Sequence, residues 1–92
     1  MFGVYKLISG EYVIGDVQEQ DNKFLLFIKS PLSIHFMPSP DGKMKINMFE
    51  FDPFAKKDSV IQISAQHVLF KCNEFPEDLK KEYIRVTSGL LV

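Results

Sequence analysis

The chain has 92 residues, of which 46% are hydrophobic and 25% are charged, and its formal net charge at pH 7 is -1. This length and balance are typical of one globular domain, spanning residues 1–92, and exclude a disordered chain. With so small a net charge the electrostatic field of the whole molecule is weak, so any anion-binding site must be local. A single cysteine excludes an internal disulfide, and the longest apolar run, residues 24–28, is too short to cross a bilayer. We therefore expect a cytoplasmic protein without a membrane partner.

The first two expected elements form a hairpin. Residues 4–8 predict a short strand that ends in a tight turn at Ser9 and Gly10, because glycine supplies the positive φ that such turns need. Residues 11–19 alternate and predict a second strand. Gly15 in its middle weakens a strand unless the sheet bends or another backbone approaches there, so we expect sharp curvature at this position.

A long, interrupted strand is expected next. After a polar turn at 20–23, the continuous apolar run 24–28 is typical of a central strand that is covered on both faces. Pro31 interrupts this run. Because residues 32–36 alternate again, we expect the strand to resume beyond a bulge or bend at Ser30 and Pro31.

The next stretch predicts a hairpin and a loop. Residues 37–43 hold the strongest turn signal in the chain, with Asp-Gly suited to a hairpin tip. Residues 44–51 predict the returning strand, in which the apolar positions slip by one residue and so indicate a bulge near Met48. The following residues, 52–59, contain a proline and the pair Lys56-Lys57 and predict an exposed loop.

The C-terminal part predicts two short strands and a helix. Residues 60–64 and 68–72 are the strands, with a corner at 65–67 between them. A helix is expected over about 76–88, because a proline suits its first turn, two acidic residues follow it, and a glycine is placed to end it. Three apolar side chains of this helix fall on one face, which should pack on the sheet or on a neighbouring subunit: Leu79, Tyr83 and Val86.

The sum is five or six short strands and one helix, and short strands with glycine and proline breaks curl and close their own edges. The sequence therefore predicts a mainly β fold: a small, strongly bent, five-stranded open barrel of SH3-like type over about residues 4–72, followed by a C-terminal helix. An OB-like barrel is the alternative of similar architecture.

The side chains that support catalysis are sparse. Two histidines and one cysteine are too few for a metal site, and His67 and Cys72 would lie on opposite faces of a continuous strand. Asp16 and Asp21 flank a hairpin end where nothing predicts burial, so a solvated rim is the better interpretation. We therefore expect no enzyme, no metal and no cofactor. The scattered lysines either contact phosphates or keep the surface soluble.

The spacing of the first hairpin resembles a known family. An apolar residue, a glycine, an apolar residue, a second glycine, an apolar residue and an aspartate follow one another as in the first signature of Sm and Sm-like (LSm) proteins: Leu7, Gly10, Val13, Gly15, Val17 and Asp21. Residues 63–70 stand where the family has its second signature, with Ser64 at the arginine position and Ala65 at the glycine position. The family carries its helix before the first strand, whereas here it follows the barrel. These departures suit a rapidly diverging source such as a phage.

The resemblance implies a ring of five to seven copies joined through edge strands, which binds single-stranded, often uridine-rich RNA around its pore. In this family a side chain between the second and third strands stacks on a base and an Asn clamps it, while the arginine of the second signature contacts base and backbone. The candidate site residues in this chain are Asn22, Lys23, Phe24, Ser64, Gln66 and His67. By strict spacing the family's Asn falls at Leu25, so Asn22 serves only if the turn is shortened.

Two alternatives stay open. Phe24 either stacks on a base or belongs to the core. The whole protein either binds single-stranded RNA or DNA, or it is a ring-forming structural or adaptor protein that contacts other proteins. Ser64 in place of arginine and the near-neutral charge favour the second function. Lysines that converge on one face would support nucleic acid, and scattered ones would support the adaptor.

Overall fold

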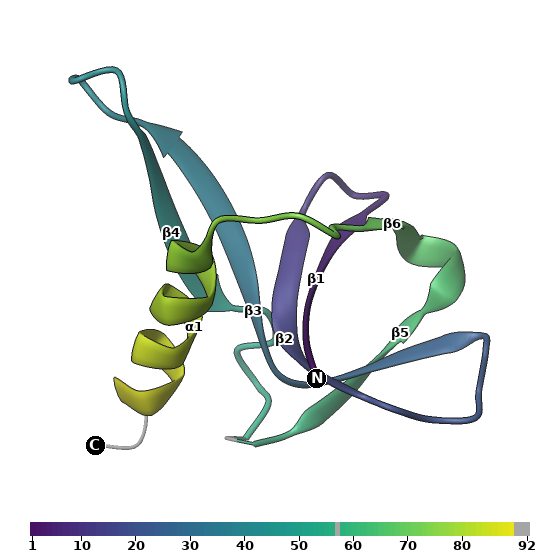
Figure 1. The fold of residues 1–92 in the computed structure, drawn as a ribbon. Helices are drawn as coiled ribbons and strands as arrows, with labels where there is room; N and C mark the ends of the chain where they lie inside the picture. Colours follow the sequence, from purple (N-terminus) through teal and green to yellow (C-terminus); the bar gives the residue numbers. More distant parts are fainter. Residues whose placement is uncertain (57, 90–92) are drawn as a thin grey trace.

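A computed structural model describes residues 1–56 and 58–89. Six antiparallel strands form one open sheet, and a helix follows them (Figure 1). The elements are β1 (Phe2–Leu7), β2 (Tyr12–Gln18), β3 (Leu25–Pro38), β4 (Met44–Glu50), β5 (Val60–Ser64), the 3-10 turn η1 (Ala65–His67), β6 (Val68–Lys71) and α1 (Glu77–Gly89). The predicted mainly β class with a C-terminal helix is confirmed, and the architecture is consistent with a small Sm-like open barrel.

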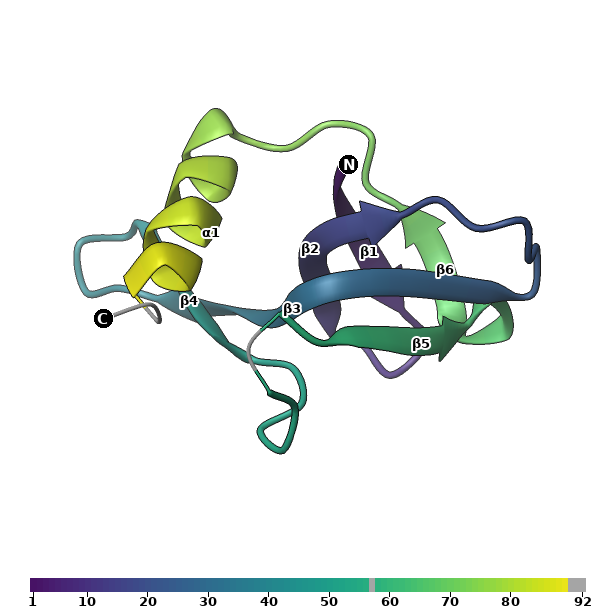
Figure 2. The same cartoon turned by 90° about the horizontal axis from the view of Figure 1, so that it is seen from below.

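The long strand β3 organises the sheet. The strands follow the order β4-β3-β2-β1-β6, and β5 also pairs with β3. The first part of β3 pairs with β5, and its second part, from Leu32 onward, pairs with β4 on the same side. Figure 2 shows β5 running beside β3 while β4 continues toward the helix. The expected loop at 52–59 separates β4 from β5, so the sheet has six strands, one more than the five of the expected barrel.

The bend lies where the sequence predicts it. At Gly15 the register between β2 and β3 shifts, and an added Cβ there would collide with Ile28 Cγ2 and lie 3.0 Å from the Lys29 carbonyl oxygen. On the opposite strand Ser30 has a φ of 52°, in the left-handed region. Because glycine alone leaves room for this approach, the expected curvature at Gly15 and the bend before Pro31 are both confirmed.

Two apolar clusters cover opposite faces of the sheet. The barrel cluster lies inside the bent strands and consists of Leu7, Val13, Ile28 and Ile63. The helix-side cluster lies between the sheet and α1 and consists of Val4, Ile14, Leu32, Ile34, Leu79 and Tyr83. Adjacent residues of β2 enter different clusters, since Val13 and Ile14 are both fully buried. The predicted apolar face of the helix is confirmed.

One detail of the expected hairpin is wrong. No bulge interrupts β4: its register with β3 runs without a shift from Glu50 opposite Leu32 to Met44 opposite Pro38. The apparent slip arises because Phe49 is not a core residue. Its side chain is 54% exposed and its ring lies edge-on to the ring of His35, at 5.3 Å between centroids. An aromatic pair on the outer face thus gives the sequence the same pattern of apolar positions that a bulge would give.

Among residues 1–56 and 58–89, no helix has the length and the apolar character that a membrane crossing requires.

Candidate nucleic-acid interface

The turn before β3 presents an aromatic ring to solvent. The Phe24 N–H donates to Asn22 Oδ1 at 2.9 Å, which closes a local turn and fixes the backbone of the tip. Phe24 is 79% exposed, and Asn22 and Lys23 are exposed beside it. The core alternative for Phe24 is therefore wrong. The inward position at this end of β3 belongs instead to Leu26, which packs against the barrel cluster.

The corner between β5 and β6 is a single 3-10 turn. Ser64 caps it, because its Oγ accepts the Gln66 N–H at 3.4 Å. The side chains of Gln66 and His67 are exposed and Ser64 is half-buried. The His67 carbonyl also accepts the Ile8 N–H at 2.8 Å, which fixes the corner to the turn between β1 and β2.

The structure brings these two segments together. The Ala65 N–H donates to the Phe24 carbonyl oxygen at 2.9 Å, and Ser64 lies opposite Leu25 in the β3–β5 register. The turn before β3 and the end of β5 consequently lie at the same end of the barrel (Figure 2). All six residues of the predicted site belong to these adjoining segments. The sequence places them about forty positions apart, so the pairing of β3 with β5 creates the juxtaposition.

The charges around this interface are mixed. Lys23 is the cation of the turn, but Glu19 and Asp21 line a shallow depression of about 610 Å³ beside Leu25 and Phe27. Carboxylates accept hydrogen bonds from base amino groups and repel phosphates. The interface is thus better suited to stacking on a base than to holding a phosphate.

No arginine lies at the interface. The one arginine of the sequence, Arg85, is on α1 and forms an ion pair with Glu82 of the same helix, which lowers the pKa of the Glu82 carboxyl. Ser64, at the position where the resemblance expects arginine, turns its Oγ to the backbone of η1. A base bound here would therefore lack a guanidinium partner.

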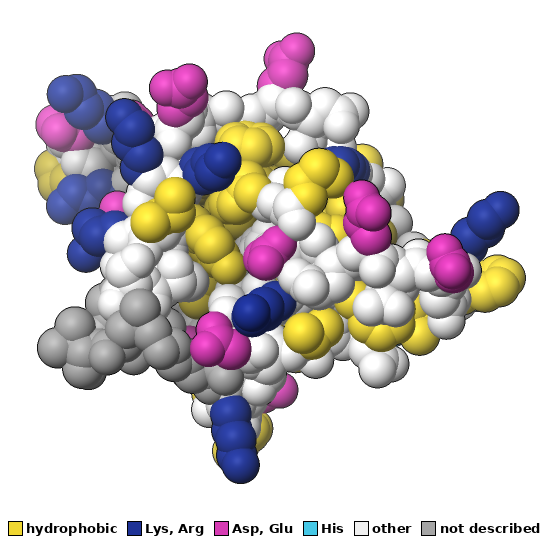
Figure 3. All heavy atoms as spheres, turned by 60° about the horizontal axis from the view of Figure 1, so that its bottom comes forward, with side chains coloured by type: hydrophobic (Ala, Val, Ile, Leu, Met, Phe, Trp, Pro, Cys, Tyr) yellow, Lys and Arg dark blue, Asp and Glu magenta, His cyan; other side chains and the backbone are white. Residues whose placement is uncertain are grey.

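The lysines outside the interface are spread over the molecule. In the described part of the chain they lie on three strands of the barrel, on the β3–β4 hairpin, on the loop after β4 and on α1: Lys6, Lys29, Lys71, Lys43, Lys45, Lys56, Lys80 and Lys81. Lys57, predicted as the second member of a basic pair, lies outside the described residues. On the face in Figure 3, basic side chains gather at the upper left with acidic ones among them, and others stand singly. By the criterion stated above, this spread favours a protein contact over a phosphate contact.

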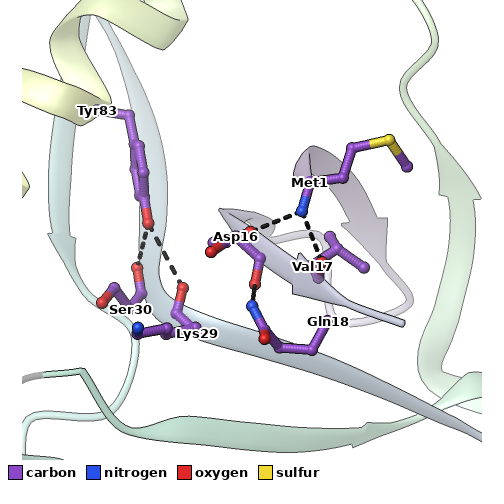
Figure 4. A network of polar contacts seen from close by, with 7 residues as sticks. All are labelled: Met1, Asp16, Val17, Gln18, Lys29, Ser30 and Tyr83. Carbon is purple, nitrogen blue, oxygen red and sulfur yellow. Dashed lines mark hydrogen bonds and ion pairs between the residues drawn. The ribbon is translucent and has the colours of Figure 1, made fainter. Parts of the chain in front are cut away.

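Sequence reasoning missed a cavity on the other side of the bend. It has a volume of about 450 Å³ and lies among the bend of β3, the loop after β4 and α1, with Asp16, Lys29, Glu50 and Tyr83 in its wall. The Tyr83 hydroxyl donates to the Ser30 carbonyl oxygen at 3.0 Å (Figure 4). No local motif could have indicated this cavity, because packing of the distant helix forms it.

At two titratable groups of this cavity, Asp16 and Tyr83, the surroundings move the pKa away from neutral pH. The Met1 ammonium donates to Asp16 Oδ1 at 2.7 Å, and this hydrogen bond lowers the pKa of the carboxyl. Burial raises the pKa of Tyr83. Near neutral pH one group is therefore ionised and the other is protonated, and neither is near its own pKa.

Potential metal ligands and thiols are also separated. Within the two described stretches, no three side chains of His, Cys, Asp or Glu are close enough to hold a metal ion. Cys72 is half-buried beside the helix-side cluster, and burial raises the pKa of its thiol. A thiol in such surroundings is a weak nucleophile.

Comparison of the chain with protein-family models and with curated proteins finds no match in either.

Proposed function

We propose that the chain is a divergent, cytoplasmic Sm-like protein that forms a ring of five to seven copies and binds single-stranded RNA or DNA without catalysis. The observation that carries this proposal is Phe24, an aromatic ring that is 79% exposed on a turn fixed by two hydrogen bonds. A rigid exposed ring costs little entropy on binding and offers a stacking surface for any base. The exposed side chains of Gln66 and His67 on the adjoining corner can donate to or accept from the edge of that base.

Two strand edges support ring formation. The Ser30 N–H bonds to the Ser59 carbonyl and the Ala65 N–H bonds to the Phe24 carbonyl, so the pairing pattern turns the backbone groups of Val60, Gln62 and Ser64 away from β3. β6 ends the strand order and, among the described strands, pairs with β1 alone; its Leu69 and Phe70 are 60% and 48% exposed. Exposed apolar edge strands promote aggregation unless they are covered. Pairing of β5 with β6 of the next copy would cover both.

A matched pair of phenylalanines tests nucleic-acid binding. Phe54 is 94% exposed, and its N–H donates to Asp52 Oδ1 at 3.0 Å, so it repeats the local turn of Phe24 at another place. Fluorescence anisotropy with oligo-U, oligo-A and single-stranded DNA should show salt-dependent binding. Phe24→Ala should weaken it roughly 5- to 150-fold, the cost of one stacked base, and Phe54→Ala should leave it unchanged. Absence of salt-dependent binding at micromolar protein would contradict the proposal.

A protein-binding adaptor is the second candidate. It is favoured by the carboxylates of Glu19 and Asp21 in the depression beside Leu25, and by Ser64 in place of arginine. Sedimentation and anisotropy together separate the two candidates. A ring that binds none of the three oligonucleotides supports the adaptor, whereas a ring whose binding depends on Phe24 supports the nucleic-acid function.

A further inference from the structure

The outer edge of β4 carries a regular row of free backbone groups. The Ser39 N–H donates to the Lys43 carbonyl at 2.9 Å, and the Phe51 N–H donates to the Pro31 carbonyl at 3.2 Å. The opposed residues at both ends of the hairpin are therefore hydrogen-bonded pairs of the antiparallel ladder. Hydrogen-bonded and non-hydrogen-bonded pairs alternate along an antiparallel ladder. Four residues of β4 therefore belong to non-hydrogen-bonded pairs and turn their N–H and C=O groups away from β3: Met44, Ile46, Met48 and Glu50. No residue within 1–56 or 58–89 bonds to these outward groups.

The hairpin also extends beyond the support of the sheet. Pairing of β2 with β3 ends at Ile34, whereas β3 and β4 continue together to Pro38 and Met44. Figure 1 shows this two-stranded ribbon projecting from the barrel. Its exposed apolar side chains include Phe36, Met37 and Met44, at 47%, 49% and 62%. A two-stranded ribbon is only marginally stable in water, so further strands would stabilise it.

One antiparallel register between two β4 strands uses all four outward residues. It centres on Asn47, places Ile46 opposite Met48 of the partner subunit, and places Met44 opposite Glu50 of the partner subunit. A shift by two positions in either direction leaves an outward residue of each strand without a partner. Backbone geometry alone thus selects a twofold axis at Asn47.

The side chains agree with this register. Lys45 lies opposite Phe49 of the partner subunit, on the face where Phe49 is 54% exposed, so an ammonium can approach an aromatic ring. The two copies of Lys45 are four positions out of register and avoid direct repulsion, roughly 13 Å apart at the spacing of a strand. On the other face Ile46 and Met48 extend the helix-side cluster toward their equivalents.

We propose that two copies of this chain pair through their β4 edges about a twofold axis at Asn47, joining the two ribbons into a four-stranded sheet. A second copy is favoured over a foreign strand because β4 complements its own sequence in the one register that satisfies its backbone. The contact uses neither β5 nor β6, so it is independent of the proposed ring and of nucleic acid.

Disulfide trapping tests the register in the full chain with Cys72→Ser as background. Residues that face each other in a non-hydrogen-bonded pair have Cα atoms about 4.5 Å apart, within the range of a disulfide. Asn47→Cys should therefore give a covalent dimer under mild oxidation, at least ten times faster than Lys45→Cys or Phe49→Cys. The double variant Lys45→Cys/Phe49→Cys should recover rapid dimer formation. A folded Asn47→Cys protein that stays monomeric on a non-reducing gel, or that reacts no faster than Lys45→Cys, would overturn the proposal.

A proline variant gives a second measurement. Met44→Pro removes an outward N–H at an exposed position, which the hairpin itself does not use, so the fold should be kept. The trapping rate of Asn47→Cys should fall several-fold when Met44→Pro is added. An unchanged rate in a protein with an unchanged circular dichroism spectrum would contradict β4 pairing.

Discussion

The barrel cluster and the helix-side cluster lie on opposite faces of one sheet, but the chain builds them differently. The barrel cluster comes from strands alone, and its members meet because the sheet bends at Gly15. The helix-side cluster needs α1, whose Tyr83 reaches the bend at Ser30 from more than fifty positions away. The bend therefore brings the residues of the barrel cluster together, while the helix packs against the bend from the opposite face of the sheet.

The largest expected effect lies in the barrel cluster. Ile28 is fully buried, and Ile28→Ala should lower the free energy of unfolding by about 2–5 kcal/mol through lost burial and the cavity left behind. Ile84→Ala on the exposed face of α1, at 51% exposure, is the control and should change stability by about 0.5 kcal/mol or less. Urea denaturation measures both. Equal losses at the two positions would show that the barrel interior does not dominate stability.

The bend itself is the next target. Gly15→Ala should destabilise by about 1–3 kcal/mol, because the new methyl group meets Ile28 and the backbone of Lys29. The exposed Glu11→Ala in the same hairpin is the control. Thermal unfolding measures the difference, and a Gly15→Ala protein as stable as the control would refute the close approach.

The hydrogen bond from the helix to the bend should contribute less to the free energy of unfolding. Tyr83→Phe removes the hydroxyl that donates to the Ser30 carbonyl, and the expected loss is about 0.5–1.5 kcal/mol. Tyr5→Phe is the matched control, since the Tyr5 hydroxyl makes no hydrogen bond within the described residues. If both substitutions cost the same in urea denaturation, the hydroxyl of Tyr83 does not hold the helix to the bend.

The smallest expected effect depends on pH. The pKa of Asp16 is lower in the folded state because the Met1 ammonium donates to its carboxylate. The contribution of this ion pair to the free energy of unfolding is thus complete above the pKa of the aspartate in the unfolded chain, about 3.9. It is lost as the pH falls through the lower pKa of the folded state. Both groups are well exposed, so we expect a few tenths of a kcal/mol. The stability difference between the native chain and Asp16→Asn should be present at pH 7 and shrink as the pH falls below about 3.9; a constant difference would contradict this.

Much of the fold could be predicted because its signals are local. Gly10 and Gly15 mark a turn and a close approach, Pro31 marks the break in the long strand, and the spacing from Leu79 to Tyr83 marks the buried helix face. The predicted bulge at Met48 failed because the pattern could not tell a surface aromatic pair from a core residue.

The candidate site was predictable only as two separate segments. Their residues follow from the resemblance, but the hydrogen bond between Ala65 and the Phe24 carbonyl depends on the register of β5 against β3, which no local pattern encodes. The exposure of Phe24 was undecided for the same reason. The cavity beside Tyr83 could not be predicted from the sequence, because it forms only when the helix packs on the bend.

Native mass spectrometry of the full chain, with and without oligo-U, tests the proposed ring and its ligand together. We expect an assembly of five to seven copies, or twice that number where β4 edges pair, that gains the mass of the oligonucleotide in the native chain and in Phe54→Ala but loses it in Phe24→Ala. A chain that stays monomeric and gains no oligonucleotide mass would contradict the proposal.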